Sequence, residues 1–405
     1  MNSIIKKKLL LLGGLKYLVP LIKKAKELGI YVITCDYLPN NIAHKYSDEY
    51  HNISILDKEA ILSLAKKLNI DGIMSFAVDP GVLTGAYVSD KMGLPSAGPY
   101  KSIEVLQDKG KFRDFLRKNN FNVPNSKSYN NVNLAINEFD FKLPVIVKPV
   151  DSAGSKGVSK VCILVELESA ILNAVEASPT KTFIIEDYLE CKGFASDTDC
   201  FSVNGSLDFI TFSNQRFDSK SPNPYTPAGF TWPSTMSEEN QNYLKKELKR
   251  LISLLDMKSS IYNIEVRLGT NDKPYIMEVS PRGGGNRLSE MIEIATGVDL
   301  ITLGIKAALG EKVEKLYEPE YKMNLGQLIL HSNKKGVFKE VIINPSIQKN
   351  IHEIDLWVKP NDPINSFSAA NNSIGTIVFK FHEKDKLEDV LTNYIDYIEV
   401  VVDQF

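Results

Sequence analysis

The sequence predicts an α/β N-terminal domain with a parallel sheet, followed by α+β segments and a small, mainly β C-terminal domain. Three observations support this fold class. Strands alternate with helices in the first hundred residues, hairpins with helices between them begin after Pro124, and the pattern becomes mainly β from about Lys322. A chain of 405 residues has room for about two to four domains. We place the expected segments at residues 1–100, 101–190, 191–315 and 316–405.

The first segment has the pattern of a doubly wound domain. Short apolar strands are expected at Leu9–Leu12, Tyr31–Cys35 and Gly72–Phe76. Amphipathic helices are expected between them, at Tyr17–Leu28 and Lys58–Leu68. Strands that are apolar throughout, in alternation with helices, are typical of a parallel sheet covered on both faces.

A glycine pair in this segment partly matches a dinucleotide site. Gly13-Gly14 follows the first strand, and Asp36 follows the second. The third glycine of that fingerprint is missing, so a nicotinamide-dependent oxidoreductase is the weaker interpretation. The glycines either let the strand turn into the helix or bring the helix N-terminus close to a small acidic ligand.

Composition and charge argue against nucleic acid and membrane as partners. The 50 acidic and 48 basic side chains nearly balance, with a formal net charge of −2, so no polyanion-binding surface is expected. The apolar run Leu9–Leu12 after Lys6-Lys7-Lys8 is too short for a secretory signal or a membrane span. The four cysteines form no C-x-x-C pair. We therefore expect a cytoplasmic protein in a reducing compartment.

The rest of the chain is expected to mix hairpins with helices. A helical pattern covers Ser102–Asn119, with Asp108-Lys109 near its middle. The elements expected between residues 145 and 256 are, in order, Val145–Lys148, Val158–Leu164, Glu166–Ala177 (helix), Thr182–Glu186, Asp199–Val203, Asp208–Ser213 and Glu238–Asp256 (helix). C-terminal strands are expected at Leu325–His331, Ile354–Val358, Thr376–Phe381 and Ile398–Val402.

The most informative stretch is a hairpin that opposes two carboxylates. Residues 262–268 and 275–280 alternate between apolar and polar side chains, and residues 269–274 have turn chemistry. Pairing about the centre of this turn places Glu265 directly opposite Glu278. The neighbouring pairs on that face are then Asn263–Ser280 and Arg267–Ile276, and the core face carries Ile264, Val266, Leu268, Met277 and Val279.

Such a carboxylate pair has to be stabilised. At about 5 Å and an effective dielectric constant of about 20, the repulsion is roughly 3 kcal/mol, and like charges directly opposite destabilise a ladder. The pair shares a proton, holds a cation, or lies on an exposed face where water screens it with help from Arg267 or Lys273. Because both groups are hard oxygen donors, Mg²⁺ is the natural cation.

A second feature is a lysine at the end of an apolar strand. Lys148 ends the strand that begins at Val145, and a loop rich in glycine and serine follows at residues 152–157. A lysine in such a strand needs an anionic partner, and loop N–H groups can bind phosphate oxygens. The loop is not a P-loop, and its glycines alone would also suit a plain hairpin. A third feature, Ile184–Leu189, is an apolar strand that leads into an acidic, aromatic connector.

These features, in this order and at these separations, resemble the ATP-grasp superfamily. The similarity is to the branch of carboxylate–amine ligases, carbamoyl phosphate synthetase and biotin carboxylase, and it covers nearly the whole chain. The most specific match is Pro281-Arg282-Gly283-Gly284-Gly285-Asn286-Arg287, with Ala295–Asp299 after it. The resemblance implies a Rossmann-like preceding domain, two ATP-grasp subdomains and a small closing domain, in the order of the four segments.

The resemblance also implies roles by position. Lys109 and Lys148 are expected to contact ATP phosphates, beneath a mobile flap that contains Ser152, Gly154, Ser155 and Gly157. Glu186 and Leu189 are expected to bind adenine through backbone groups. The expected metal ligands are Glu265, Glu278 and Ser280, for Mg²⁺ or alternatively Mn²⁺. Arg282 and Lys148 are the expected catalytic residues. Candidates for binding the substrate acid are Arg287, Asn286 and Arg216.

Two positions depart from the family pattern. Where the family often has Asn as a third metal ligand, this chain has Ser280, a weaker ligand that Asn263 opposite it would assist. Where the family often has a Glu for the ribose hydroxyls, this chain has Gly193. The expected substitutes are Glu190, Asp197 and Asp199.

The resemblance implies an ATP- and Mg²⁺-dependent ligase that activates a small carboxylate as an acyl phosphate and couples it to an amine, releasing ADP and phosphate. One alternative is a bicarbonate-activating carboxylase, which would need a carrier partner. Another is a non-catalytic ATP-binding protein, although such a protein does not need Lys148, Glu265, Glu278 and Arg282 together. A homodimer is expected from the resemblance alone.

Overall fold

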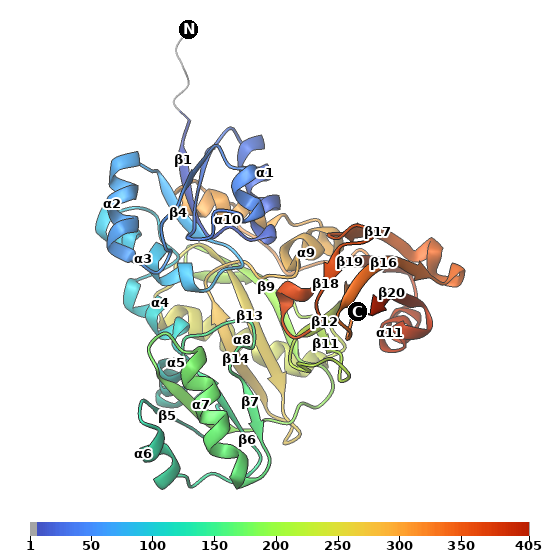
Figure 1. The fold of residues 1–405 in the computed structure, drawn as a ribbon. Helices are drawn as coiled ribbons and strands as arrows, with labels where there is room; N and C mark the ends of the chain where they lie inside the picture. The colour runs from blue at the N-terminus through green and yellow to red at the C-terminus, as the bar shows by residue number, and fades with distance from the viewer. Residues whose placement is uncertain (1–5, 405) are drawn as a thin grey trace.

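The computed structural model describes residues 6–404 (Figure 1), and its N-terminal strands form a parallel sheet in the order β3-β2-β1-β4. The elements are β1 (Lys8–Leu12), α1 (Val19–Glu27), β2 (Tyr31–Cys35), β3 (Glu49–His51), α2 (Lys58–Leu68), β4 (Gly72–Ser75) and α3 (Pro80–Met92). Leu9 and Leu11 pack towards α1 and α10 (Leu300–Ala308), and Leu10 and Leu12 pack towards α2 and α3. Helices therefore cover both faces, and the predicted parallel sheet is confirmed.

An antiparallel sheet in the order β5-β8-β6-β7 follows. The elements here are α4 (Tyr100–Gln107), α5 (Lys109–Lys118), β5 (Ser126–Tyr129), α6 (Val132–Asn137), β6 (Val145–Pro149), β7 (Ser159–Val161), α7 (Leu167–Ala177) and β8 (Phe183–Asp187). The single helix predicted over Ser102–Asn119 is wrong. The backbone of Asp108 is extended, and its carboxylate accepts a hydrogen bond from the Lys111 N–H at 2.9 Å. Asp108 thus caps a second helix, α5, which begins at Lys109.

A second antiparallel sheet has the order β10-β9-β13-β14. Its elements are β9 (Ser196–Val203), β10 (Ser206–Phe209), α8 (Glu238–Leu254), β13 (Ser260–Leu268) and β14 (Pro274–Ser280), with α9 (Leu288–Thr296) after them. The buried side chains of α8 share a core with Ile264 and Val266 of β13. The opposite, polar face of β13 and β14 is the face that carries the predicted carboxylates.

A five-stranded antiparallel sheet joins two distant parts of the chain. Its order is β11-β12-β15-β19-β17, from β11 (Asn214–Phe217), β12 (Pro227–Trp232), β15 (Asn324–Leu330), β17 (Ile351–Leu356) and β19 (Gly375–Phe381). The remaining C-terminal elements are β16 (Gly336–Ile343), β18 (Pro363–Ile364), α11 (Lys384–Thr392) and β20 (Ile398–Gln404). The four predicted C-terminal strands correspond to β15, β17, β19 and β20. Strands from residues 191–315 and 316–404 therefore lie in one sheet.

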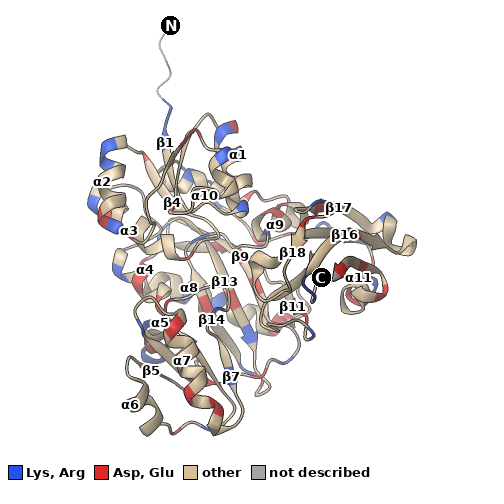
Figure 2. Ribbon diagram, viewed as in Figure 1, with Lys and Arg blue, Asp and Glu red and all other residues tan. Residues whose placement is uncertain are grey.

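Short 3₁₀ helices complete the fold, at Lys16–Leu18, Ile42–Lys45, Leu164–Glu166, Pro345–Asn350, Ala370–Asn372 and Tyr394–Asp396. Across residues 6–404, we find no helix with both the length and the apolar character to cross a membrane. Figure 2 shows positive and negative residues interspersed over all parts of the chain.

Candidate active site

Three carboxylates lie in one row across the second antiparallel sheet. Asp197 of β9 is opposite Glu265 of β13, and Glu265 is opposite Glu278 of β14. Residues directly opposite in a ladder point to the same face, so the three carboxylates face away from the α8 core. The predicted opposition of Glu265 and Glu278 is confirmed.

A β-bulge changes the register at one end of this hairpin. The shift falls between Glu265 and Val266, so Arg267 lies opposite Tyr275 instead of the predicted Ile276. Ile276 takes the core position that was predicted for Met277. The Arg267 guanidinium reaches back to Glu265, with its Nη2 2.9 Å from Oε1. Burial acts to raise the pKa of Glu265, but the Arg267 charge holds it below its usual value.

The next row of the sheet connects to the N-terminal domain. It consists of Asp199, Asn263 and Ser280, and the predicted Asn263–Ser280 pair is confirmed. Ser280 Oγ donates to Asp79 Oδ1 at 2.8 Å and accepts from Gln107 Nε2 at 2.9 Å. Its hydroxyl is therefore already engaged, which leaves one lone pair for a metal ion.

Arg282 is held by an acid from the N-terminal domain. Its Nε and Nη2 lie 2.8 and 2.5 Å from the two oxygens of Asp79, which directly precedes α3. Its Nη1 donates to Asn263 Oδ1 at 3.2 Å. Only 7% of Arg282 is exposed. This bidentate pair fixes the guanidinium beside the carboxylate rows and ties the N-terminal domain to the sheet.

Lys148 and Glu186 form a buried ion pair, and Arg113 is the second partner of that carboxylate. Arg113 Nε lies 2.9 Å from Glu186 Oε2, and its Nη1 donates to the Met277 carbonyl at 2.8 Å. Lys148 Nζ pairs with Glu186 Oε1. The strand lysine thus has the anionic partner that the sequence requires. Burial lowers the pKa of Lys148, with Glu186 opposing this effect.

Lys109 joins the flap to the carboxylate row. Its Nζ lies 3.4 Å from Glu278 Oε2 and donates to the Ser152 carbonyl at 3.0 Å. Burial acts to lower the pKa of Lys109, but the charges of Glu278 and Asp79 raise it overall. The first turn of α5 therefore places one ammonium group between the flap and a predicted metal ligand.

The flap, residues 152–157, contacts the rest of the protein at several points. Ser155 Oγ donates to the Tyr225 carbonyl at 3.2 Å, and Ser155 has a left-handed backbone, with φ of 58°. A Cβ added to Gly154 would meet nothing within 4 Å, whereas one on Gly157 would lie 2.5 Å from the Ala177 Cβ. Gly157 is thus the position where the loop needs glycine most, because its φ is also positive, at 71°.

The connector after β8 leads from the first antiparallel sheet to the carboxylate hairpin. Thr270 N–H donates to the Glu190 carbonyl at 3.1 Å, and Lys192 N–H to the Leu268 carbonyl at 2.7 Å. The backbone of Leu189 makes no hydrogen bond to any residue between 6 and 404. Its donor and acceptor are therefore free for a ligand. Of the three suggested ribose contacts, Glu190 lies in this connector, whereas Asp197 and Asp199 lie in the carboxylate rows.

Two of the suggested substrate residues are already paired. Arg287 Nη1 lies 2.7 Å from Glu353 Oε1, and its Nη2 lies 3.2 Å from Glu290 Oε1. Arg216 is not brought to the site at all: it pairs with Glu388 of α11 on the far face of the five-stranded sheet. Asn286 Oδ1 accepts from the Tyr17 hydroxyl at 3.3 Å.

Sequence reasoning missed two charged residues of the cluster. Arg113 lies four positions after Lys109, so both side chains project from one face of α5. That spacing was a usable signal, although its partner Glu186 could not be identified from sequence. Asp79 has no local signal of its partner, because its pairing with Arg282 depends on how the N-terminal domain packs on the sheet.

The carboxylate face suits a magnesium ion that is shared with phosphates. Within residues 6–404, no three His, Cys, Asp or Glu side chains come close enough to hold a metal without other ligands. Mg²⁺ commonly takes only one or two carboxylates and completes its shell with phosphate oxygens and water. Glu265 and Glu278, with Lys109 beside them, fit that arrangement.

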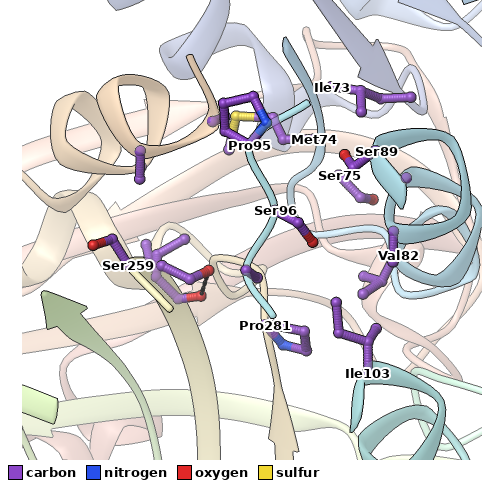
Figure 3. Close-up of a pocket in the computed structure, with 18 residues that line it drawn as sticks. Ile73, Met74, Ser75, Val82, Ser89, Pro95, Ser96, Ile103, Ser259 and Pro281 are labelled. Atoms are coloured by element: carbon purple, nitrogen blue, oxygen red, sulfur yellow. Dashed lines mark hydrogen bonds between the residues drawn. The ribbon is translucent and has the colours of Figure 1, made fainter. Parts of the chain in front are cut away.

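A small cavity behind Arg282 is not the nucleotide site. It lies between β4, α3, α10 and the start of β13 and is lined in part by Met74, Ser75, Ser96 and Pro281 (Figure 3). Its volume of about 60 Å³ holds roughly two water molecules. Residues of both the N-terminal domain and the sheet line this cavity, and its volume is too small for a nucleotide.

Known proteins match this chain in sequence. Residues 141–290 match the family model of the ATP-grasp domain. Over 303 residues, 72% of this chain, the sequence is 28% identical to the carbamoyl phosphate synthase large chain of Thermoanaerobacter pseudethanolicus. That alignment covers 27% of the synthase chain, so the present chain spans about a quarter of the length of this relative.

Solved structures match the fold over nearly the whole chain. The L-amino acid ligase from Bacillus licheniformis has a TM-score of 0.80 at 19% identity, over 98% of this chain and 99% of that one. The biotin carboxylase domain of 2-oxoglutarate carboxylase from Hydrogenobacter thermophilus, solved with MgADP and bicarbonate, has a TM-score of 0.73 at 17% identity. That match covers 98% of this chain and 91% of the carboxylase domain. At these identities the similarity establishes the shared fold.

Proposed function

We propose that this chain is an ATP- and Mg²⁺-dependent ligase, on the basis of the match of residues 141–290 to the family model of the ATP-grasp domain. It would activate a small carboxylate, such as an amino acid, as an acyl phosphate and couple it to an amine, releasing ADP and phosphate. One observation carries the proposal. The opposed carboxylates Glu265 and Glu278 share a polar face with the ammonium of Lys109, in a cluster that also holds Lys148 and Arg282.

The residues have complementary tasks in this proposal. Lys109 and Lys148 bind the phosphate oxygens, and the flap covers them. Glu265 and Glu278 would hold Mg²⁺, which neutralises charge on the phosphates when bound. Arg282, held in place by Asp79, stabilises the charge that develops on the transferring phosphoryl group. Catalysis of this kind rests on positioning and electrostatics, so no nucleophilic side chain is needed.

The connector and flap divide the binding of ATP between them. The free backbone groups of Leu189 suit the adenine edge, and Glu190 beside Leu189 is the proposed ribose contact. Glu186 itself positions Lys148 through its carboxylate. A closed flap would exclude water from the acyl phosphate, which otherwise hydrolyses.

A bicarbonate-activating carboxylase is the second candidate. The fold similarity to a biotin carboxylase domain favours it. Both candidates share phosphoryl transfer from MgATP to a carboxylate-type oxygen, and they differ in the acid and in the acceptor. The assay therefore has to vary both.

The test measures ADP release from MgATP with a panel of amino acids, other small carboxylates and bicarbonate, with and without amines. Wild type is compared with Glu278→Gln and with Glu399→Gln, which changes an exposed glutamate of β20. We expect acid-dependent release that falls about 100-fold or more in Glu278→Gln and persists in Glu399→Gln. Release in Glu278→Gln at the wild-type rate would overturn the proposal.

A further inference from the structure

Three side chains at the end of β17 present an acidic and aromatic surface next to the arginine motif. They are Glu353, Asp355 and Trp357, which are spaced two residues apart along the strand direction and therefore lie on one face. β17 is the last strand of its sheet, so this face lies at the sheet edge. The indole Nε1 of Trp357 donates to Asp355 Oδ2 at 2.7 Å, which fixes the ring plane.

A positive charge already lies against this surface. The Lys16 ammonium is 3.0 Å from the centre of the Trp357 ring and 5.3 Å from the centre of the Tyr17 ring. The two rings meet edge to face, with centres 6.3 Å apart. An ammonium over an indole face, close to a carboxylate, is the arrangement by which proteins recognise cationic ligands.

The carboxylates around this surface outnumber the cations. Arg287 is shared by Glu290 and Glu353, has Asp355 at 3.8 Å, and donates a further bond to Thr376 at 3.0 Å. Three carboxylates thus face two cations, Arg287 and Lys16. Because the donors of Arg287 are engaged in this way, this region is better suited to a positive group than to the acid first suggested for Arg287.

The surface contacts the arginine motif, because Arg287, the last residue of the motif, pairs with Glu353. Tyr17, which packs against Trp357, donates its hydroxyl to Asn286 at 3.3 Å. Asn286 ends the short segment that begins at Arg282, the residue expected at the transferring phosphoryl group. A substrate whose reacting end approaches Arg282 can therefore direct its other end to this surface.

We propose that Glu353, Asp355 and Trp357 form a cation subsite for a non-reacting ammonium or guanidinium group of the substrate, in the place where the Lys16 ammonium lies. This inference rests on the proposed ligase function and narrows its substrate class to basic amino acids or related diamines. Burial lowers the pKa of Lys16 to about 7, against the effect of Asp355. At neutral pH Lys16 is thus only partly charged, and a permanently charged guanidinium displaces it.

Substrates of similar length and different charge test the subsite. ADP release from MgATP is measured with L-lysine, L-arginine and the neutral norleucine, for wild type, Trp357→Leu and Trp357→Phe. We expect a KM about tenfold lower for the basic amino acids in wild type. The preference is lost in Trp357→Leu and kept in Trp357→Phe, which retains an aromatic face. Melting temperatures establish that each variant folds.

Direct binding separates this inference from the ligase function. Calorimetry measures L-arginine binding to the same proteins and to Lys16→Met, where removal of the resident ammonium should tighten binding. ADP release with neutral acids but no preference for basic ones would overturn the subsite and leave the ligase proposal standing. Arginine binding that weakens about tenfold in Trp357→Leu, without any ADP release, would support the subsite and overturn the ligase proposal. The absence of both would overturn both.

Discussion

The buried carboxylate of Glu186 allows a quantitative test of how the proposed ATP-binding cluster is held together. Only 2% of Glu186 is exposed, and its two oxygens pair with Arg113 and Lys148. Burial acts to raise the pKa of Glu186, but the two cations outweigh it and lower the pKa from 4.5 to about 2. At about 1.4 kcal/mol per pKa unit, the ionised group adds about 3 kcal/mol to the stability of the fold.

Glu186→Gln removes this contribution and leaves two buried cations without their carboxylate. We expect the variant to be about 3 kcal/mol less stable near pH 7, at the lower end of the roughly 3–5 kcal/mol for breaking a buried ion pair. A carboxyl whose pKa is depressed in the folded state contributes fully above its unfolded pKa, near 4.5. The contribution is lost between about pH 4.5 and about pH 2, so the difference between the two proteins should shrink progressively over that range.

Urea unfolding followed by circular dichroism measures this difference. Wild type, Glu186→Gln and the exposed control Glu399→Gln are compared at about pH 7, 5 and 3.5. The first unfolding transition is the relevant one, because a chain with several sheets does not necessarily unfold in one step. A difference below about 0.5 kcal/mol near pH 7, or one that stays constant down to about pH 3.5, would refute the reasoning.

Further variants test the individual parts of the site. Arg282→Lys keeps the positive charge but loses the bidentate pairing with Asp79. The kcat for ADP release should therefore fall about 10²-fold, while MgATP should still raise the melting temperature. An unchanged kcat would contradict the role of Arg282. Gly157→Ala should raise the KM for ATP more than Gly154→Ala. Both glycines have positive φ, but only at Gly157 would the added Cβ collide with a neighbour, Ala177. Equal effects on the KM would contradict the close packing of Gly157. Removal of divalent cations with EDTA should abolish ADP release, and added Mg²⁺ should restore it. Ser280→Ala should shift the Mg²⁺ dependence only slightly, because the Ser280 hydroxyl is bonded to Asp79 and Gln107.

The carboxylate hairpin was predictable because its information is local. A two-residue alternation and a turn of known centre determine which residues oppose each other, and Glu265 and Glu278 therefore pair as predicted. The bulge that moves Arg267 opposite Tyr275 has no comparable local signal. The break at Asp108 did have a local signal, because Asp is a favoured residue at the N-cap of a helix. The helical periodicity on both sides of Asp108 concealed this signal.

Contacts between distant segments were not predictable from the sequence. Asp79 pairs with Arg282 only because the N-terminal domain packs on the sheet. Arg113 of α5 pairs with Glu186 of β8, which lies 73 residues later in the chain. Residues 213–232 carry no strong strand pattern, yet half of them form β11 and β12. Their partner β15 lies about a hundred residues further along the chain, so no local pattern could reveal the pairing.

The shared five-stranded sheet limits how this protein can be recombined with others. β12 is bonded to β15, so a chimera joined near residue 316 would have to match two strands from different parents in register. A mismatch would expose strand edges that invite aggregation. The exchangeable unit therefore includes the carboxylate hairpin, β11–β12 and all later strands together. Substrate preference encoded near Trp357 would be inherited together with the face that carries Glu265 and Glu278, and not separately from it.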